Sequence, residues 1–318
     1  AALHLALLAL GIKQNDNVWV SDLTFIGGVS PILYQNAIPT FIDSNSDYWT
    51  IDVDLLETSL KKAEKSRILP KALIVTDIYG QCPDYDGIKK ICKKYGLYLV
   101  ADCAESIGSF YKKQHTGYLA DIAIYSFNGN KIITSSGGGM VSSHNKEWID
   151  KARYFATQAR KKYIYYEHAD IGYNYRISNI VAAVGKAQLE SIEERVLLRK
   201  KTLKRYKDGL EDISGISFIK EMPDTRMNAW LSVMLIDNKT ISVSPEDIRI
   251  ELEKHNIESR PLWKPMHMQP VFKKYNYFGK GVSESLFQQG LCLPSGSSLT
   301  ESQQEKIISF MRHFITKA

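Results

Sequence analysis

Short apolar runs alternate with segments of helical periodicity through the first two thirds of the chain. The apolar runs predict strands, and they occupy residues 17–21, 38–43, 71–80, 97–102 and 121–127. Residues 1–10 and 27–36 are typical of helices, and residues 137–143 are compatible with a further strand. Apolar strands that alternate with helices indicate a mostly parallel sheet with helices on both faces.

The pattern changes near Arg195. A long charged helix, a strand and two capped helices follow, at residues from 195 onward, 230–237, 244–256 and 300–314. Ser244 is the expected N-cap of the first capped helix, with Pro245 in its first turn. Thr300 and Gln303 predict a capping box for the second. These elements favour a separate, smaller unit at the C-terminal end.

Composition adds limits to this picture. The chain has 318 residues, of which 44% are hydrophobic and 24% charged, so it can bury a sizeable core. We expect a large domain over residues 1–194 and a smaller C-terminal α+β domain over residues 195–318. No apolar run approaches the roughly 20 residues of a membrane span, and no signal peptide is recognisable, so we expect a cytoplasmic protein with no membrane partner.

Cysteine spacing and charge exclude other classes of site. Cys82, Cys92, Cys103 and Cys292 form no CxxC pair, so we expect reduced thiols and no metal site. The formal charge of +6 favours anionic ligands. Residues 199–207 form the densest basic run, but they lie in a helical pattern and are interpreted as a solvated face. We therefore expect no nucleic-acid partner.

Two residues point to a particular chemistry. Lys131 lies in the run SFNGNKIITSSGGG, after a strand pattern and before a glycine cluster, and Asp102 ends the strand LYLVAD. Open α/β sheets carry their chemistry at the carboxyl ends of strands. Pyridoxal 5′-phosphate (PLP) needs an amine for its aldehyde, an acid for its pyridine nitrogen and donors for its phosphate. Alternatives remain for each residue: Lys131 as an exposed lysine, and Asp102 as a helix cap.

Long motifs carry a family resemblance over nearly the whole chain. They are AALHLALLALG, DCAESIGS, SFNGNKIIT, GYNYRISNI, ESRPLWKPMH and QGLCLPSGS. With them the chain resembles the sugar aminotransferases of the DegT/DnrJ/EryC1/StrS family, which have the PLP-dependent aspartate aminotransferase fold (fold type I). SFNGNKIITSSGGGM and ESRPLWKPMHMQPVF are most similar to the branch that aminates UDP-linked 4-keto-6-deoxy-N-acetylhexosamines.

The resemblance implies roles for residues around the cofactor. Lys131 would hold PLP and move a proton between substrate and cofactor, and Asp102 would pair with the pyridine nitrogen. Glu105 would lie near the cofactor, Ser126 would bind its phosphate, and Phe25 would cover one face of the ring. The alternatives are an exposed first-turn glutamate for Glu105, a turn serine for Ser126 and core packing for Phe25.

Other implied roles concern the phosphate and the neighbouring subunit. Asn174 matches an asparagine that reaches the phosphate of the partner subunit, so the active sites would be shared in a homodimer; the alternative is an amide that satisfies its own loop. Ala1 matches a position whose backbone N–H meets the phosphate. Family members begin a few dozen residues earlier, so we expect that the large domain here lacks its N-terminal segment and part of the phosphate site.

Substrate-binding residues are expected in two places. Thr24 would touch the ring substituents or the substrate. Arg260, Trp263, Lys264 and His267 lie in a proline-stiffened segment, where cations and aromatic rings suit a nucleotide sugar or a donor carboxylate. We expect these four to face the active site, although a structural loop with His267 hydrogen-bonded in place is the alternative.

The resemblance implies a PLP-dependent aminotransferase. It would move an amino group from L-glutamate to a nucleotide-linked sugar, most specifically a UDP-4-keto-6-deoxy-N-acetylhexosamine, in surface polysaccharide or glycan biosynthesis. Alternatives are a relative that acts on a dTDP- or GDP-linked keto sugar or a cyclitol, and a non-catalytic regulatory homologue. The dehydratases of the family replace the lysine with histidine, whereas this chain keeps Lys131.

Overall fold

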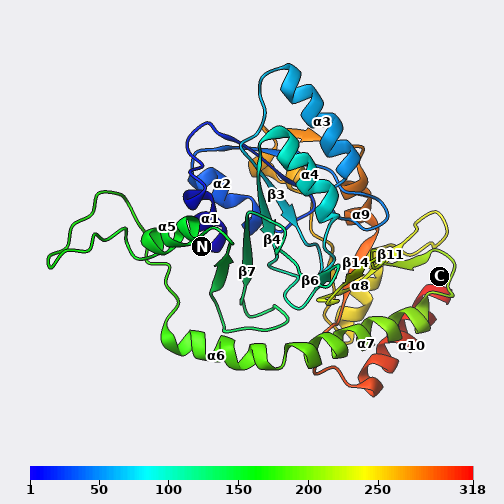
Figure 1. The fold of residues 1–318 in the computed structure, drawn as a ribbon. Helices are drawn as coiled ribbons and strands as arrows, with labels where there is room; N and C mark the ends of the chain where they lie inside the picture. Colours follow the sequence, from blue (N-terminus) through cyan, green and yellow to red (C-terminus); the bar gives the residue numbers. More distant parts are fainter. Residues whose placement is uncertain (318) are drawn as a thin grey trace.

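The chain folds around a seven-stranded sheet that is covered by helices on both faces (Figure 1), in a computed structural model that describes residues 1–317. The strands, in their order across the sheet, are β13 (Asn276–Phe278), β2 (Ile38–Ile42), β1 (Asn17–Ser21), β3 (Ala72–Thr76), β4 (Tyr98–Asp102), β7 (Ile122–Ser126) and β8 (Gly139–Ser142). All neighbours pair in parallel except β7 and β8. The expected α/β fold with a mostly parallel sheet is confirmed.

The central strands are buried on both faces. In β3, Ala72 and Ile74 belong to one core cluster, while Leu73 and Val75 belong to the other. All four are 0% exposed, because side chains alternate between the faces of a strand and each face is covered. This is why the strands read as continuous apolar runs.

Five helices cover these two faces. On one face lie α1 (Ala2–Ala9), α2 (Ser30–Tyr34) and α5 (Lys146–Ala156), and on the other α3 (Val53–Lys65) and α4 (Tyr85–Tyr95). Asp52 caps α3 through the N–H of Leu55 at 3.0 Å, and Gly96 closes α4 in a left-handed conformation with φ of 69°. The capping residues determine where these helices begin and end, and the apolar face of each helix packs against the sheet.

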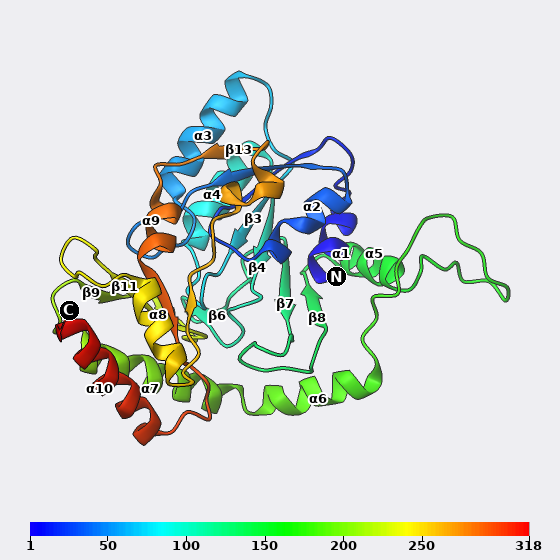
Figure 2. The same cartoon turned by 180° about the vertical axis from the view of Figure 1, so that it is seen from behind.

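A second sheet is entirely antiparallel. It has the order β12 (Arg260–Pro261), β14 (Gly290–Leu293), β11 (Ser232–Ile236) and β9 (Ile216–Phe218). The helices α7 (Ile192–Leu210), α8 (Pro245–Lys254) and α10 (Glu301–Lys317) surround it (Figure 2). Both predicted caps are confirmed: Asp247 N donates to Ser244 Oγ at 3.2 Å, and Gln303 N donates to Thr300 Oγ1 at 3.3 Å.

The remaining elements connect these units. They are a small sheet of β10 (Thr225–Arg226), β5 (Phe110–Tyr111) and β6 (Gln114–His115), the helices α6 (Asn179–Glu190) and α9 (Val282–Gln289), and the 3-10 helices η1 (Ile26–Gly28), η2 (Met266–Met268) and η3 (Pro270–Phe272). Strand β13 joins the large sheet although it follows residue 195. The domain boundary at residue 195 stays a proposal. It would separate the two sheets, but it leaves β13 on the C-terminal side although this strand belongs to the large sheet.

Some predicted elements differ in detail. The helix expected over residues 27–36 is divided into η1 and the short α2, because Gly27 and Gly28 are poor helix formers and Pro31 starts a new helix. The strand expected over residues 71–80 ends at Thr76. Beyond it, Ile78 and Gln81 form an isolated bridge, and Gly80 has a φ of 97°.

Three further facts concern the chain as a whole. No helix within residues 1–317 is long and apolar enough to cross a bilayer. Cys82, Cys92, Cys103 and Cys292 are all buried and free. The part of the chain that the structure describes contains no group of three or more His, Cys, Asp or Glu side chains arranged for a metal ion.

Candidate active site

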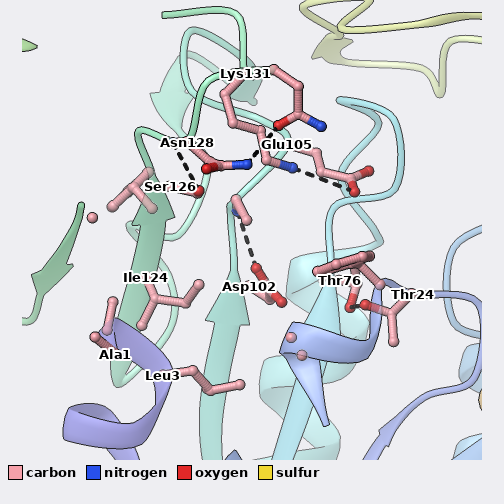
Figure 3. Close-up of a pocket in the computed structure, with 18 of the residues that line it drawn as sticks. Ala1, Leu3, Thr24, Thr76, Asp102, Glu105, Ile124, Ser126, Asn128 and Lys131 are labelled. Carbon is pink, nitrogen blue, oxygen red and sulfur yellow. Dashed lines mark hydrogen bonds and ion pairs between the residues drawn. The ribbon is translucent and has the colours of Figure 1, made fainter. Parts of the chain in front are cut away.

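Polar residues at the carboxyl ends of neighbouring strands line a cavity of about 480 Å³ (Figure 3). Asp102 ends β4, Thr76 ends β3 and Ser126 ends β7, while Thr24 follows β1 by three residues. Parallel strands all finish at the same edge of a sheet, so these side chains converge although they are far apart in sequence. Lys131 enters the cavity from the loop between β7 and β8.

Lys131 is held inside the cavity. Its backbone N–H donates to Asn128 O at 3.0 Å, and the indole N–H of Trp230 donates to Asn130 O at 2.9 Å, which fixes the loop. The amine lies 3.8 Å from Glu105 Oε1 and 3.9 Å from the centroid of the Trp230 ring. The side chain is 11% exposed, so the alternative of an exposed lysine is excluded.

Asp102 presents a buried carboxylate on the floor of the cavity. Its Oδ1 accepts a hydrogen bond from Ala104 N at 3.1 Å. A Cβ at position 28 would lie 3.0 Å from Oδ2, so Gly28 leaves space beside that oxygen. Burial raises the pKa of Asp102, and the Ala104 N–H and the charge of Lys131 partly offset it. Residues 104–108 form turns, so Asp102 is not the cap of a following helix.

Glu105 contacts both the amine of Lys131 and the indole ring of Trp263. Its Oε2 accepts from Tyr79 N at 2.7 Å, and its Oε1 accepts from Trp263 Nε1 at 3.2 Å. Burial raises its pKa, while the charge of Lys131 and the Tyr79 N–H oppose the rise. At 4% exposure it is not the exposed first-turn glutamate of the alternative interpretation.

Phe25 and Thr24 also line the cavity. Phe25 is 53% exposed, which excludes core packing as its role, and its ring centroid lies 5.5 Å from that of Trp263. Thr24 is buried, and its Oγ1 accepts a hydrogen bond from Thr76 Oγ1 at 3.0 Å. An aromatic face is therefore open to the cavity beside a fixed pair of hydroxyls.

The end of the cavity next to β7 and α1 carries small polar groups. Ser126 lines this end of the cavity. Its hydroxyl also accepts a hydrogen bond from Asn128 N at 3.3 Å, which is the contact expected of a turn serine. Ala1 lines the same end. Gly139 pairs with Ser126, and a Cβ there would come within 2.5 Å of Tyr125 O. Only glycine permits that approach of the two strands.

Comparison with known proteins shows the family to which this chain belongs. The profile of the DegT/DnrJ/EryC1/StrS aminotransferase family matches residues 1–312. The chain belongs to the DegT/DnrJ/EryC1/StrS aminotransferase family. EpsN of Bacillus subtilis (strain 168), which is assigned to the pyridoxal phosphate-dependent aminotransferases, is 45% identical over 98% of this chain and 81% of its own length.

Other members of the DegT/DnrJ/EryC1/StrS family match more distantly. A GDP-perosamine synthase of Escherichia coli O157:H7 is 34% identical over 98% of this chain and 83% of its own. A UDP-4-amino-4,6-dideoxy-N-acetyl-beta-L-altrosamine transaminase of Campylobacter jejuni is 34% identical over 69% of this chain and 58% of its own. The crystal structure of a family aminotransferase from Brucella abortus has a TM-score of 0.91 and 28% identity, and it covers 99% of this chain and 83% of its own.

The protein is a PLP-dependent aminotransferase of this family, and the residues of the cavity fit PLP. The cavity offers an amine, a buried carboxylate with space beside one oxygen, an exposed aromatic face, and small polar groups at one end. A buried carboxylate that no cation contacts is costly, so the site suits a ligand that brings a positive charge to Asp102. The protonated pyridine nitrogen of PLP is such a group.

Two of the predicted substrate residues line a different cavity. Arg260 and Lys264 line a neighbouring space of about 1090 Å³, and Trp263 lines both. His267 lines neither: its Nδ1 lies 2.7 Å from Asp22 Oδ2 and its Nε2 lies 2.9 Å from Glu284 Oε1. His267 therefore fits the alternative interpretation, a structural loop with this residue hydrogen-bonded in place, since both ring nitrogens already have carboxylate partners. A role for these residues in substrate binding stays a prediction.

Asn174 lies apart from the cavity. It is exposed, in the segment between α5 and α6 that projects from the body of the molecule (Figure 1). It pairs with Thr157 in an isolated bridge and lines a third cavity, which also contains Ala1. Its contact with a partner's phosphate stays a prediction.

Sequence reasoning predicted Trp263 but missed the two rings that stack with it in an aromatic wall. Tyr79, Trp230 and Trp263 stack with ring centroids 6.2–6.4 Å apart, and Lys131 lies over Trp230. The one signal for Tyr79 was its place three residues beyond the end of β3, close to the strand edge that carries Asp102. Trp230 comes from a segment almost 100 residues after Lys131, and nothing local connects the two.

Proposed function

We propose that this aminotransferase moves the amino group of L-glutamate to the ketone of a nucleotide-linked 4-keto-6-deoxy sugar, with a UDP-4-keto-6-deoxy-N-acetylhexosamine as the acceptor. The observation that carries the proposal is the convergence of Lys131, Asp102 and Glu105 in one cavity, with the amine 3.8 Å from Glu105. An amine and a buried carboxylate in one cavity with aromatic rings meet the needs of amino transfer through PLP.

Each residue then has a task. PLP supplies an aldehyde for amines and a ring that withdraws electrons from the reacting carbon. Lys131 would hold PLP through its aldehyde, and its amine would move a proton to and from the substrate carbon. The charge of Asp102 keeps the ring nitrogen protonated. Glu105 holds Trp263 and the amine in place through the contacts described above.

Phe25 and the small polar end of the cavity orient the cofactor in this proposal. The exposed ring of Phe25 would cover one face of the pyridine ring. Ser126 and the backbone N–H of Ala1 hold the phosphate, and both line the same end of the cavity. Thr24, fixed by its hydrogen bond with Thr76, contacts the ring substituents or the sugar.

Named relatives and motifs support a nucleotide sugar as acceptor. A UDP-amino-sugar transaminase and a GDP-perosamine synthase both match the chain at 34% identity. The motifs around Lys131 and Trp263 favour the UDP-linked branch. The GDP-linked acceptor is the second candidate, because the synthase matches 98% of this chain whereas the transaminase matches 69%.

We also propose a homodimer with shared sites. Helix α6 has no buried residue, although it carries Ile180 at 79% exposure, Val184 at 47% and Leu189 at 49%. The projecting segment before it exposes further large side chains, namely Tyr163, Ile164, Tyr165, Tyr166 and Ile171. Continuous exposed apolar surface marks a protein interface. A partner on this surface lies close to Asn174.

The proposed setting is the cytoplasm, in surface polysaccharide or glycan biosynthesis. All four cysteines are buried and unpaired, which fits a reducing compartment. A relative at 26% identity, SpsC of Bacillus subtilis, is a spore coat polysaccharide biosynthesis protein, which supports this setting.

One experiment tests the reaction. Purified protein is supplied with PLP, L-glutamate and either the UDP- or the GDP-linked keto sugar, and 2-oxoglutarate and the amino sugar are measured by mass spectrometry. We expect amination of the UDP sugar and none with Lys131→Ala, which removes the amine. Production of 2-oxoglutarate with neither sugar aminated would refute the nucleotide-sugar acceptor, and equal turnover by Lys131→Ala would refute the role of the lysine.

A further inference from the structure

Asp77 is a buried acid that the proposed reaction does not use. It follows Thr76, which ends β3 and lines the cofactor cavity, and its own side chain lies on the opposite face of the sheet, against α4. The residue is 0% exposed, and its hydrogen-bond partners within residues 1–317 are neutral hydroxyl groups. A buried carboxylate without a cation beside it is costly, so the surroundings of Asp77 determine which charge it carries.

A chain of buried hydroxyl groups connects Asp77 to the turn that follows β4. Tyr85 of α4 donates to Asp77 Oδ1 at 2.7 Å, and Ser106 Oγ is hydrogen-bonded to Asp77 Oδ2. Ser106 Oγ lies 2.9 Å from Thr116 Oγ1, which also donates to Ser106 O at 3.2 Å. None of these four residues is more than 1% exposed, so water does not compete for the bonds.

Ser106 belongs to the turn that presents both carboxylates of the cofactor cavity. Its N–H donates to Cys103 O at 3.2 Å, which closes the turn that follows Asp102 and contains Glu105. At the start of the turn, the N–H of Asp77 donates to Asp102 O at 3.1 Å. Asp77 therefore holds the turn at both ends, through its backbone at Asp102 and through its carboxyl group at Ser106.

The charge of Asp77 changes near neutral pH. Burial raises its pKa to about 7, although the hydrogen bonds from Ser106 and Tyr85 oppose the rise, and the charge of Asp102 adds to it. The other titratable groups that face Asp77 are kept neutral by burial, which raises the pKa of each: Tyr85 of α4, Cys103 after β4, Tyr125 of β7, and Cys82. The charge of this cluster near neutral pH therefore depends on Asp77 and its neighbour Asp102.

We infer that Asp77 is a positioning residue of the cofactor site, which fixes the turn of Asp102 and Glu105 through Ser106 and whose negative charge favours a protonated ring nitrogen at Asp102. This inference rests on the proposed function and deepens it, because it adds a group that lines no part of the cofactor cavity. A negative charge behind Asp102 attracts a positive one in front of it. Cofactor binding and loss of the Asp77 proton therefore favour each other.

Binding of pyridoxamine 5′-phosphate to the cofactor-free protein tests the inference without any reaction. This form of the cofactor carries the ring nitrogen but no aldehyde, so it binds without a bond to Lys131. Calorimetric titrations are made below, at and above about pH 7, where Asp77 loses its proton. The proteins are the wild type, Asp77→Asn, Ser106→Ala, Tyr85→Phe and the control Asp54→Asn.

Asp77→Asn keeps the shape of the side chain but cannot carry the charge. We expect it to bind like the wild type below about pH 7 and roughly tenfold more weakly above it, the effect of a coupling of one pKa unit. Ser106→Ala keeps the charge but removes the link to the turn, so it should weaken binding at every pH. Asp54 is an exposed residue in the first turn of α3, outside this cluster, and its variant should match the wild type.

Tyr85→Phe removes the other hydrogen bond to the carboxyl group and leaves the turn untouched. Because that bond lowers the pKa of Asp77, we expect the gain in affinity with rising pH to move to higher pH, with unchanged binding below it. A residue with a merely structural role would instead lose affinity by the same factor at every pH.

Three results would overturn the inference. They are the wild-type pH profile in Asp77→Asn, a loss in that variant that is equal at every pH, and wild-type affinity at every pH in Ser106→Ala. A failure of the proposed function is distinguishable, because no donor or sugar enters the titration: the profiles then differ as expected while no keto sugar is aminated. Melting temperatures check that each variant is folded, and the Tyr85→Phe profile decides the question if Asp77→Asn is not.

Discussion

Asp102, Glu105 and Lys131 place two carboxylates and one amine in a buried space. Burial raises the pKa of both acids, and the charge of Lys131 opposes the rise in each. For an acid whose pKa is raised by folding, the contribution to stability is lost as the pH rises through the folded pKa. The cofactor-free protein therefore bears a cost at neutral pH that a positively charged ring nitrogen beside Asp102 relieves.

The substitution Asp102→Asn removes the negative charge of this residue while keeping nearly the same side-chain shape. We expect a loss of roughly 10²–10³-fold in the rate with L-glutamate, the typical effect of removing one preorganised electrostatic group. The cofactor-free variant should melt at a higher temperature than the wild type at neutral pH, because a buried charge is gone. Stopped-flow absorbance of the bound cofactor and thermal melts measure the two effects.

Asp150→Asn is the matched control. Asp150 is an exposed residue of α5, paired with Lys146 on the surface. Its replacement should change neither the rate with L-glutamate nor the melting temperature of the cofactor-free protein. A wild-type rate in Asp102→Asn would contradict the role proposed for this carboxylate.

The segment around η2 shows how one loop is fixed to the large sheet. Asp22 O accepts from Met266 N at 3.0 Å, and Asp22 Oδ1 accepts from His267 N at 3.0 Å. The imidazole of His267 joins Asp22 to Glu284 and stacks on Tyr277, with centroids 3.8 Å apart. These contacts hold the loop that carries Trp263 beside the wall that carries Phe25.

His267 makes this attachment sensitive to pH. Burial disfavours its charged form, but the hydrogen bonds and charges of Asp22 and Glu284 outweigh burial and raise the pKa of His267 above 6.5. Its contribution to stability is therefore complete below about pH 6.5 and is lost as the pH rises through the folded pKa. Glu284→Gln should lower that pKa, so that the melting temperature falls at a lower pH than in the wild type.

Melting curves across the neutral and alkaline range, with an NMR titration of the His267 ring, measure this shift. Glu251→Gln is the control, because Glu251 lies 3.8 Å from the half-exposed His255 in a surface pair, and such pairs contribute little. Identical pH profiles for Glu284→Gln and the wild type would rule out the charged attachment.

Elements with strong local signals were predicted well. Strands β1, β2, β4 and β7 and the caps of α8 and α10 follow from apolar runs and capping residues that act over a few positions. The short strands β12 and β13 were missed, because two or three residues carry no periodicity and pair only after the chain has folded. Helix α6 was missed as well.

At the scale of the whole molecule, the exposed face of α6 is the main feature that a single chain leaves unexplained. We expect the double change Ile180→Asp and Val184→Asp to convert a dimer to a monomer, because two charges on an apolar interface remain unpaired and desolvated. The monomer should bind PLP more weakly if Asn174 reaches the partner's site. Light scattering after size exclusion and a PLP titration measure both effects.

Ile250→Asp is the control for this change. Ile250 is a 41% exposed residue of α8, away from the α6 face, and its replacement should leave the dimer intact. A wild-type protein that is monomeric at micromolar concentration would contradict the shared site directly.

Sequence by itself determined the layered fold and singled out Lys131 and Asp102 as the two residues proposed to carry the chemistry. Lys131 was predicted because it follows a strand pattern and Asp102 because it ends one, and the carboxyl ends of parallel strands meet at one edge. Apolar runs report burial directly, so the sheet could be predicted without knowing which strands are neighbours.

Tertiary structure alone decided what surrounds these two residues. Trp230 reaches Lys131 from a distant segment, His267 turns to Asp22 and Glu284, and Arg260 and Lys264 line a separate cavity instead of the cofactor site. The contacts of Lys131 with Trp230 and of His267 with Asp22 join residues far apart in the sequence, where neither periodicity nor capping carries information. Their geometry depends on how the two sheets pack, and that packing is settled by all the side chains at once.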